Sequence, residues 1–199
     1  MEREKITEIS EKRIYRLLER RKTCSNTKFD VFFDTVEDFD GNLTEDFLVV
    51  RPRIQTAEMV AAVCILPELD GKIGLMKGYR HQLGRQVWQA PAGFVEENES
   101  PVEAALRELM EETALTSEPD KVFSLGMYFP DPGLIEGRVA LFYAKCTASS
   151  RGSPVSGEVG TGGLHFLSRK ELLELIGSSY DLGGSTIVAC FRYLKGALE

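Results

Sequence analysis

GFVEENESPVEAALRELMEETAL, residues 93–115, is the stretch that decides how the chain is interpreted. It predicts a helix over residues 100–113, because Ser100 is a good N-cap, Pro101 suits the first turn and Glu103 completes a capping box. A repeat of about 3.6 residues per turn divides this helix into two sides. One side is predicted to carry the residues Val102, Leu106, Leu109, Met110 and Thr113, and the opposite side Glu108, Glu111 and Glu112.

Three carboxylates on one turn of a helix need a chemical explanation. Each like-charge pair at this spacing costs roughly 0.2–0.5 kcal/mol, and a hard divalent cation with oxygen ligands is the natural compensation. The alternative is a solvated acidic face that binds nothing. Two features favour the cation: Arg107 lies inside the acidic cluster, one turn before Glu111, and a tight Pro-Ala-Gly turn at 91–93 comes just upstream.

Outward from this helix, the chain alternates between short strands and helices, which favours an α+β fold with a mixed sheet. The Gly- and Ser-rich segment 147–163 is predicted to be a loop. Strands are predicted at 29–36, 45–51, 59–66, 72–77, 86–90, 122–128, 139–145 and 164–167, and further helices at 4–20, 169–175 and 185–198.

The composition is typical of a packed globular protein, with 43% hydrophobic and 28% charged residues. No apolar run is long enough to span a membrane, and the charged N-terminus lacks the apolar core of a signal peptide. The net charge of −7 disfavours a nucleic-acid backbone as a partner. We therefore expect a cytoplasmic protein with neither a nucleic-acid nor a membrane partner.

The four cysteines and two histidines do not have the spacing of a zinc site. Two of the cysteines, Cys64 and Cys146, lie in strand-like apolar runs, where a buried thiol is the usual outcome. The full set is Cys24, Cys64, Cys146, Cys190, His81 and His165.

The segment 93–115 resembles the Nudix box, because its glycine, its glutamates and its Arg-Glu-Leu run keep the spacing of that motif. Ala114 stands where the box has a glycine that ends the helix in a left-handed conformation, and alanine there costs about 1 kcal/mol. The segments 77–80, 88–94 and 131–134 are also similar to the ADP-ribose pyrophosphatase branch of the Nudix family. The resemblance covers the chain from about residue 27 onward.

This resemblance implies an α/β/α sandwich with a mixed sheet, preceded by a small β subdomain that is exchanged across a homodimer. The predicted division is a helical extension at 1–25, an antiparallel β subdomain at 26–56 and a Nudix hydrolase domain at 57–199. The implied activity is Mg²⁺-dependent hydrolysis of the diphosphate bond of ADP-ribose to AMP and ribose 5-phosphate, with Mn²⁺ as a substitute cofactor.

The resemblance also implies roles for single residues. Arg107 would hold the glutamates in place, and Glu111 and Glu112 would take part in catalysis. The general base would come from the loop 147–163, where Glu158 is the acidic residue. Loop solubility is the alternative for Glu158, and Glu136 is the second candidate base. The implied metal ligands are the backbone carbonyl of Ala92 and the side chains of Glu96, Glu108, Glu111 and Glu112.

Substrate binding is implied for six further residues. Phe29 and Phe47 match aromatic positions that enclose the adenine, although core packing is the alternative for each ring. Arginine side chains can act as bidentate donors to the diphosphate. The full set is Phe29, Phe47, Arg51, Arg53, Arg80 and, in the turn at 131–134, Gly133.

Three residues depart from the pattern of this branch and widen the choice of substrate. Gln89 stands where a Glu usually precedes the Pro-Ala-Gly turn, Gly78 replaces a common Gln, and Gly137 replaces an acid. They leave open another nucleoside-diphosphate sugar, such as GDP-mannose or ADP-glucose. A non-catalytic nucleotide sensor is a further alternative, which the complete set of box glutamates disfavours. An RNA-binding or decapping role is disfavoured by the acidic charge balance.

Overall fold

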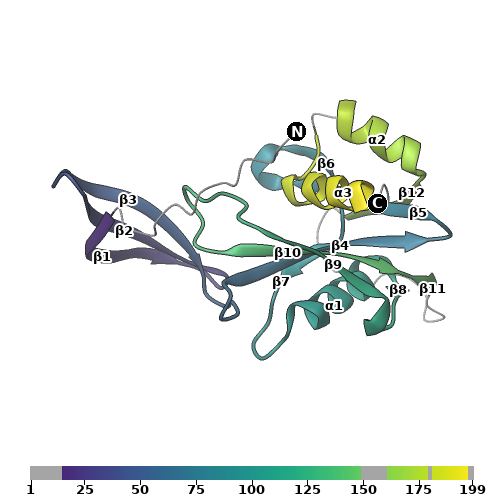
Figure 1. The fold of residues 1–199 in the computed structure, drawn as a ribbon, viewed down its shortest axis with the longest axis horizontal. Coiled ribbons are helices and arrows are strands. Elements are labelled where there is room, and N and C mark those ends of the chain that lie inside the picture. The colour runs from purple at the N-terminus through teal and green to yellow at the C-terminus, as the bar shows by residue number, and fades with distance from the viewer. Residues whose placement is uncertain (1–14, 149–160, 179–180, 197–199) are drawn as a thin grey trace, which may run out of the picture. The chain divides into compact units, whose positions relative to one another are not determined.

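The computed structural model describes residues 15–148, 161–178 and 181–196 (Figure 1). The chain divides into two compact units, residues 1–51 and 52–199. The first contains an antiparallel sheet and the second a mixed sheet with helices, which confirms the predicted α+β class. The predicted three-part division, with boundaries after residues 25 and 56, stays a prediction.

The smaller unit is built from three strands in the order β1-β2-β3. They are β1 (Tyr15–Ser25), β2 (Phe29–Asp38) and β3 (Leu43–Pro52). A turn held by Asp38 connects β2 to β3: its Oδ1 accepts the N–H groups of Asp40 at 2.9 Å and of Asn42 at 2.8 Å. A short polar side chain that binds backbone two residues ahead is a common way to close such a turn.

The helix predicted over residues 4–20 is wrong where the structure describes that segment. Residues 15–25 form β1, paired antiparallel with β2. Arg20 donates to the buried Asp34 from Nε at 2.8 Å and from Nη2 at 2.7 Å. Leu17 and Leu18 are 51% and 45% exposed, so the apolar face that suggested a helix is not buried here. Residues 1–14 lie outside the described residues.

The larger unit contains a seven-stranded mixed sheet. Its main path is β12-β5-β4-β10-β9, with β6 beside β5 and β7 beside β4. β10 runs parallel to β4, and the other pairs are antiparallel. The strands are β4 (Val60–Leu69), β5 (Lys72–Arg80), β6 (Arg85–Gln89), β7 (Ala92–Phe94), β9 (Val122–Tyr128), β10 (Arg138–Lys145) and β12 (Thr161–Leu167); β8 (Leu115–Thr116) pairs separately with β11 (Thr147–Ala148).

Helices cover both faces of this sheet (Figure 1). α1 (Pro101–Thr113) lies on one face, and α2 (Arg169–Ser178) and α3 (Gly184–Gly196) lie on the other. Two short 3₁₀ helices, at His81–Leu83 and Pro119–Lys121, connect strands. This arrangement is the predicted α/β/α sandwich.

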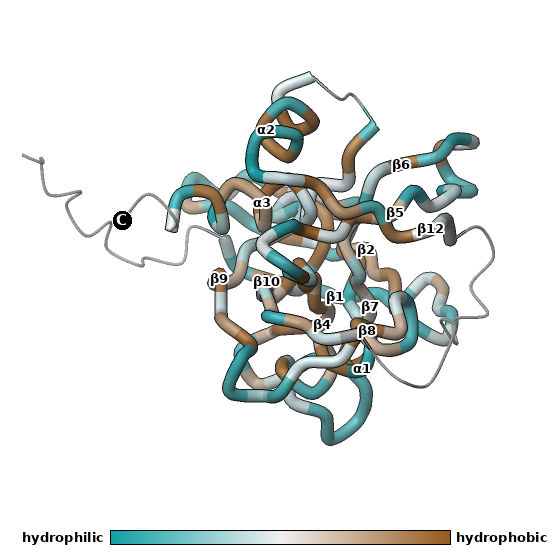
Figure 2. Tube along the Cα trace, turned by 90° about the vertical axis from the view of Figure 1, so that its right-hand side faces the viewer, coloured by the Kyte–Doolittle hydropathy of each residue, from teal (hydrophilic) through white to brown (hydrophobic). Residues whose placement is uncertain are grey.

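The central strands β4 and β10, coloured largely apolar in Figure 2, supply the core. Because side chains alternate along a strand, β4 buries Val63 and Ile65 with Leu109 of α1, and Cys64 and Leu66 with Cys190 of α3. The helices are therefore fixed to opposite faces of one rigid sheet.

All four cysteines are free thiols. Cys64, Cys146 and Cys190 are buried and Cys24 is exposed, so the predicted burial of Cys64 and Cys146 is confirmed.

Among the described residues, no helix combines the length and apolar character needed to cross a membrane.

Candidate active site

The site begins with the short strand β7. Its residues pair with β4, with Ala92 opposite Cys64 and Phe94 opposite Ala62. The N–H of Ile65 donates to the carbonyl of Pro91 at 2.9 Å. The Pro-Ala-Gly turn is therefore fixed directly on the central strand of the sheet.

Helix α1 has the predicted start and end. The Oγ of Ser100 accepts the N–H of Glu103 at 3.3 Å, and Oε2 of Glu103 accepts the N–H of Ser100 at 2.8 Å. This is a complete capping box. At the other end, Ala114 has the left-handed φ of 56° predicted from the box pattern, and its N–H donates to Met110. The carboxylates between these ends are thus held on a helix of fixed length.

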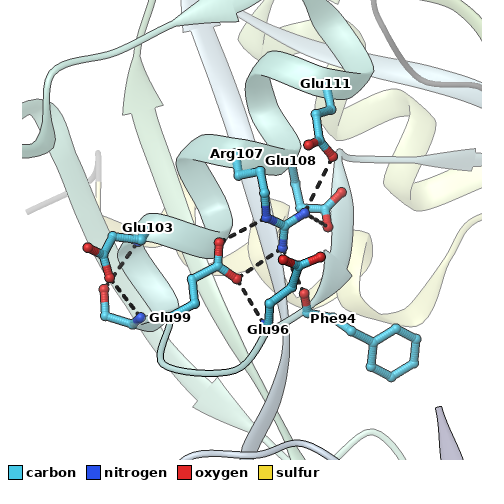
Figure 3. Close-up of polar contacts among 8 residues, drawn as sticks. Phe94, Glu96, Glu99, Glu103, Arg107, Glu108 and Glu111 are labelled. Carbon is cyan, nitrogen blue, oxygen red and sulfur yellow. Dashed lines mark hydrogen bonds and ion pairs between the residues drawn. The ribbon is translucent and has the colours of Figure 1, made fainter. Parts of the chain in front are cut away.

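Arg107 connects α1 to the loop that precedes it (Figure 3). Its Nε and Nη2 donate to the two carboxylate oxygens of Glu99 at 2.9 and 3.0 Å, and Nη2 also donates to the carbonyl of Phe94 at 2.9 Å. Its Nη1 lies 2.7 Å from Glu108 but 3.4 Å from Glu111. Arg107 therefore pairs with Glu99, eight residues away, through two of its nitrogen atoms, and also with Glu108 and Glu111 on its own helix.

The charges in this network shift one another's pKa values. The hydrogen bond from Arg107 is the largest cause that lowers the pKa of Glu99 below its ordinary value of 4.5. The hydrogen bond to Glu99 in turn raises the pKa of Arg107, with a further contribution from Glu108. Glu99 is therefore ionised and Arg107 charged at neutral pH.

Glu108 and Glu112 both lie against the backbone of the Pro-Ala-Gly turn. A Cβ at position 93 would overlap Oε1 of Glu108, so glycine leaves the space in which this carboxylate lies. Oε2 of Glu112 accepts the N–H of Ala92 at 3.1 Å, and Glu112 is only 7% exposed. Two carboxylates are thus held at one short stretch of backbone.

This geometry corrects the predicted division of α1 into two sides. Leu109 and Thr113 are buried, as predicted, but Glu112 is buried with them on the side that faces the sheet. Val102, Leu106 and Met110 are only partly buried. The prediction of Glu112 on the opposite, polar side is wrong, because the backbone N–H of Ala92 gives its carboxylate a partner inside the fold.

A divalent cation fits the donors at this turn. Within the described ranges, no three His, Cys, Asp or Glu side chains already stand in an arrangement that could hold a metal ion. Mg²⁺, however, is commonly bound through one or two carboxylates, with water and substrate phosphate completing its octahedron. Glu108 and Glu112, with the backbone at residues 92–93, offer such a partial set of oxygen ligands. Glu111 is 47% exposed in its side chain and has turned toward Arg107.

The other predicted ligand and base residues lie in different surroundings. Glu96 is exposed on the loop between β7 and α1, and its N–H donates to Oε2 of Glu99 at 2.9 Å. Glu136 is partly buried just before β10. Glu158 lies outside the described residues.

The predicted substrate-binding residues are spread over both units. Phe29, Phe47 and Arg51 belong to the smaller unit, where the guanidinium of Arg51 lies 5.4 Å from the ring centroid of Phe32. Arg53 is exposed at the start of the larger unit. Gly133 lies in an exposed turn, where its N–H donates to Oδ1 of Asp131 at 3.1 Å.

Arg80 lines a pocket that no local pattern of the sequence indicates. The pocket has a volume of about 340 Å³ and lies between the β5–β6 hairpin, the Pro-Ala-Gly turn and the start of α3. It reaches Ala92, the residue whose N–H binds Glu112. Its lining residues are Arg80, Leu83, Val87, Gln89, Ala90, Ala92, Leu182, Gly183, Gly184, Ser185 and Thr186.

Comparison with known proteins agrees with this architecture. A solved structure described as an ADP compounds hydrolase superposes with a TM-score of 0.75 over 92% of this chain and 95% of that one. At 20% sequence identity, this likeness shows the fold.

Three characterised proteins are similar in sequence. An ADP-ribose pyrophosphatase of Bacillus subtilis (strain 168) is 31% identical over 127 residues, 63% of either chain. An ADP-sugar pyrophosphatase of Mus musculus is 35% identical over 80 residues, 38% of this chain and 37% of the relative. A methanol dehydrogenase activator of Bacillus methanolicus is 29% identical over 162 residues, 81% and 82% of the two chains. The match thus spans less than two thirds of the first two relatives.

The family itself is decided by a longer match. The sequence pattern of the NUDIX domain matches residues 57–180, which is more than half of the chain and includes β7, α1 and the carboxylates at the turn. The chain therefore belongs to the Nudix family.

Proposed function

We propose that the chain hydrolyses the diphosphate bond of ADP-ribose to AMP and ribose 5-phosphate, with Mg²⁺ as cofactor and Mn²⁺ as a substitute. The observation that carries the proposal is the pair Glu108 and Glu112 at the backbone of residues 92–93, held by a helix that Arg107 ties to its preceding loop. The names of the relatives from Bacillus subtilis and Mus musculus support a substrate of the ADP-sugar class.

When bound, the cation would supply positive charge to the diphosphate and lower the pKa of a bound water. Glu108, Glu112 and the carbonyl of Ala92 would hold it, and Glu111 and Glu96 are the further candidates. Arg107 keeps the loop and helix in register, because it binds Glu99 and the Phe94 carbonyl at once. This positioning matters since the attacking and leaving oxygens must be in line with phosphorus.

Two steps depend on residues away from the carboxylates. Arg80 is the candidate for neutralising the diphosphate in the larger unit, because it lines the pocket that reaches Ala92. Glu158 is the proposed general base and Glu136 the alternative. Glu158→Gln should lower kcat while substrate binding stays intact, and equal losses in rate and binding would count against this role.

The direct test is a substrate panel at neutral pH with Mg²⁺. It contains ADP-ribose, ADP-glucose, GDP-mannose, NADH and diadenosine polyphosphates, with phosphatase-releasable phosphate as the readout. We expect the highest kcat/KM for ADP-ribose, loss of turnover in EDTA, and recovery with Mg²⁺ or Mn²⁺. Faster turnover of GDP-mannose or ADP-glucose would favour the second candidate, which the departures at Gln89 and Gly78 support. No turnover on the whole panel would favour a nucleotide sensor.

We further propose that the protein is a cytoplasmic homodimer, with residues 26–56 as a β subdomain exchanged between protomers and residues 57–199 as the hydrolase domain. Light scattering coupled to size-exclusion chromatography should give twice the chain mass of 22.2 kDa. A monomer mass at micromolar concentration would contradict the dimer and leave the hydrolase proposal standing.

A further inference from the structure

The pocket between β6 and the start of α3 contains a polar group that the fold itself leaves unsatisfied. Gln89 is 6% exposed, and its Oε1 has no hydrogen-bond partner among the residues that the structure describes. Most buried polar side-chain atoms in folded proteins have a partner, and a buried acceptor without one destabilises the fold. Gln89 lines the pocket, so a bound molecule with a hydroxyl or N–H group can satisfy this oxygen.

The neighbouring strand makes room for this side chain. Gly78 of β5 lies beside Gln89, and a Cβ at position 78 would stand only 2.5 Å from Nε2 of Gln89. Glycine at 78 and glutamine at 89 are two of the departures from the pattern of the ADP-ribose pyrophosphatase branch. In the structure they form one feature, because the glycine provides the space that the amide occupies.

Other groups that line the pocket favour an anion. Arg80 contributes a guanidinium, which suits phosphate. Gly184, Ser185 and Thr186 are the first residues of the 13-residue helix α3 and also line the pocket. The first N–H groups of a helix have no partner within it, and the helix dipole is positive there. The hydroxyl of Thr186 is fixed by the N–H of Ala90, which donates to it at 2.9 Å.

The remaining described lining favours a sugar over a base. The other side chains are aliphatic, from Leu83, Val87, Ala90, Ala92 and Leu182, and none of the described lining residues is an aromatic ring on which a base can stack. The volume of about 340 Å³ lies at the small end of the usual range for ligand sites, about 300–1,000 Å³. A ring with hydroxyls and one phosphate fits this combination of size, acceptor and cation.

We propose that this pocket receives the sugar-phosphate half of the substrate, with Gln89 accepting a hydrogen bond from a sugar hydroxyl and Arg80 with the start of α3 binding the phosphate. The inference rests on the proposed function, which makes a sugar phosphate one of the two products. Gln89 is then a specificity-determining residue. Ala92 lines the pocket and donates its N–H to Glu112, so in this proposal the scissile diphosphate lies next to Ala92.

A tryptophan next to Gln89 can report on ligand binding to this pocket by its fluorescence. Trp88 is the one tryptophan of the chain and directly precedes Gln89. The backbone of Trp88 is bonded to the segment that leads into α3: its N–H donates to Asp181 and its carbonyl accepts from Gly183, both at 2.9 Å. Fluorescence of Trp88 therefore reports on the pocket, and calorimetric titration gives an independent affinity.

The experiment titrates the full chain in EDTA with ribose 5-phosphate, ribose, inorganic phosphate and AMP. We expect ribose 5-phosphate to bind tightest. Gln89→Leu should weaken ribose 5-phosphate at least about 10-fold, the effect of losing about 1.4 kcal/mol, and leave inorganic phosphate within about 2-fold. Arg80→Gln should weaken both ligands. Gln86→Leu, an exposed glutamine on the same strand and outside the pocket, is the matched control and should bind as the wild type does.

The melting temperature of Gln89→Leu should not fall below that of the wild type, because the change removes a carbonyl that has no partner. The inference is overturned if this variant binds ribose 5-phosphate with unchanged affinity, or if the wild type does not bind it detectably. It is also overturned if AMP binds more tightly than ribose 5-phosphate and its binding depends on Gln89. Turnover of ADP-ribose is measured separately. If ADP-ribose is hydrolysed but ribose 5-phosphate binding does not depend on Gln89, only the pocket proposal is rejected. If ribose 5-phosphate binding depends on Gln89 but no substrate is hydrolysed, only the hydrolase proposal is rejected.

Discussion

Glu112 shows at the scale of one residue how the fold holds a negative charge. It is buried beside the Pro-Ala-Gly turn and accepts one backbone hydrogen bond. Glu112→Gln keeps the size of the side chain and removes the charge, so we expect kcat for ADP-ribose to fall at least about 100-fold, the scale of losing one electrostatic group. Glu103→Gln is the matched control, because it is exposed on the same helix and glutamine also completes a capping box. Steady-state kinetics decide, and a wild-type kcat for Glu112→Gln would remove this residue from the catalytic set.

Gly93 matters because it leaves room for the carboxylate of Glu108 beside it. A methyl group at this position would overlap the carboxylate of Glu108, so either that carboxylate or strand β7 must move. Because a misplacement of about 1 Å can cost about 100-fold in rate, we expect Gly93→Ala to lower kcat by about 10- to 100-fold. Gly177→Ala, where a Cβ meets nothing within 4 Å, should leave kcat unchanged. Equal rates for the two variants would show that Glu108 does not need its observed position.

The ion pair of Glu99 with Arg107 predicts a pH dependence of stability. The folded protein holds the pKa of Glu99 below its ordinary value of 4.5, so the pair stabilises the fold at pH values above 4.5. That contribution is lost as the pH falls below 4.5 and through the lowered pKa. Glu99→Gln should therefore lower the free energy of unfolding at pH 7 and flatten its decline in acid. Denaturant titrations between pH 3 and 7 test this, with Glu97→Gln on the same exposed loop as the control.

At the scale of elements, the end of α1 offers a stabilising change. Ala114 has a φ of 56°, a left-handed conformation that glycine adopts at no steric cost. We expect Ala114→Gly to raise the free energy of unfolding by about 1 kcal/mol. The same replacement inside the helix, Ala104→Gly, should lower it by at least about 1 kcal/mol. Equilibrium urea unfolding measures both, and a loss of stability in Ala114→Gly would contradict the strain assigned to this residue.

The elements that the sequence predicts well are those with local signals. The start of α1 follows from such a signal, the capping box of Ser100 and Glu103, whereas its left-handed end at Ala114 is expected only from the resemblance to the Nudix box. Strand β1 has no such local signal, because its conformation depends on β2, to which Arg20 is joined through Asp34. The burial of Glu112 is also non-local. A helical wheel assigns sides by polarity alone, and the partner of Glu112 lies 20 residues earlier, on β7.

At the scale of the whole molecule, the same reasoning explains which part of the site could be predicted. The carboxylates and Arg107 come from one continuous segment, so the sequence places them together. The pocket does not: Gln89 lies on β6, and Thr186 lies 97 residues later on α3. Both residues line the same pocket only because β6 packs against the start of α3. The orphaned oxygen of Gln89 is likewise visible only once its neighbours are placed.

The reactivity of the four thiols tests which parts of each unit are buried. Cys24 is exposed, whereas three thiols are buried in the larger unit, where burial raises the pKa of Cys146 to about 11 and that of Cys190 to about 12. At pH 8 we therefore expect one fast equivalent per chain with a disulfide reagent, absent in Cys24→Ser. The remaining three should react together, at a rate set by opening of the larger unit. Raising the pH from 7 to 9 should leave the three buried thiols limited by opening. A second fast thiol in the native protein would mean that the larger unit does not bury its core as one cooperative body.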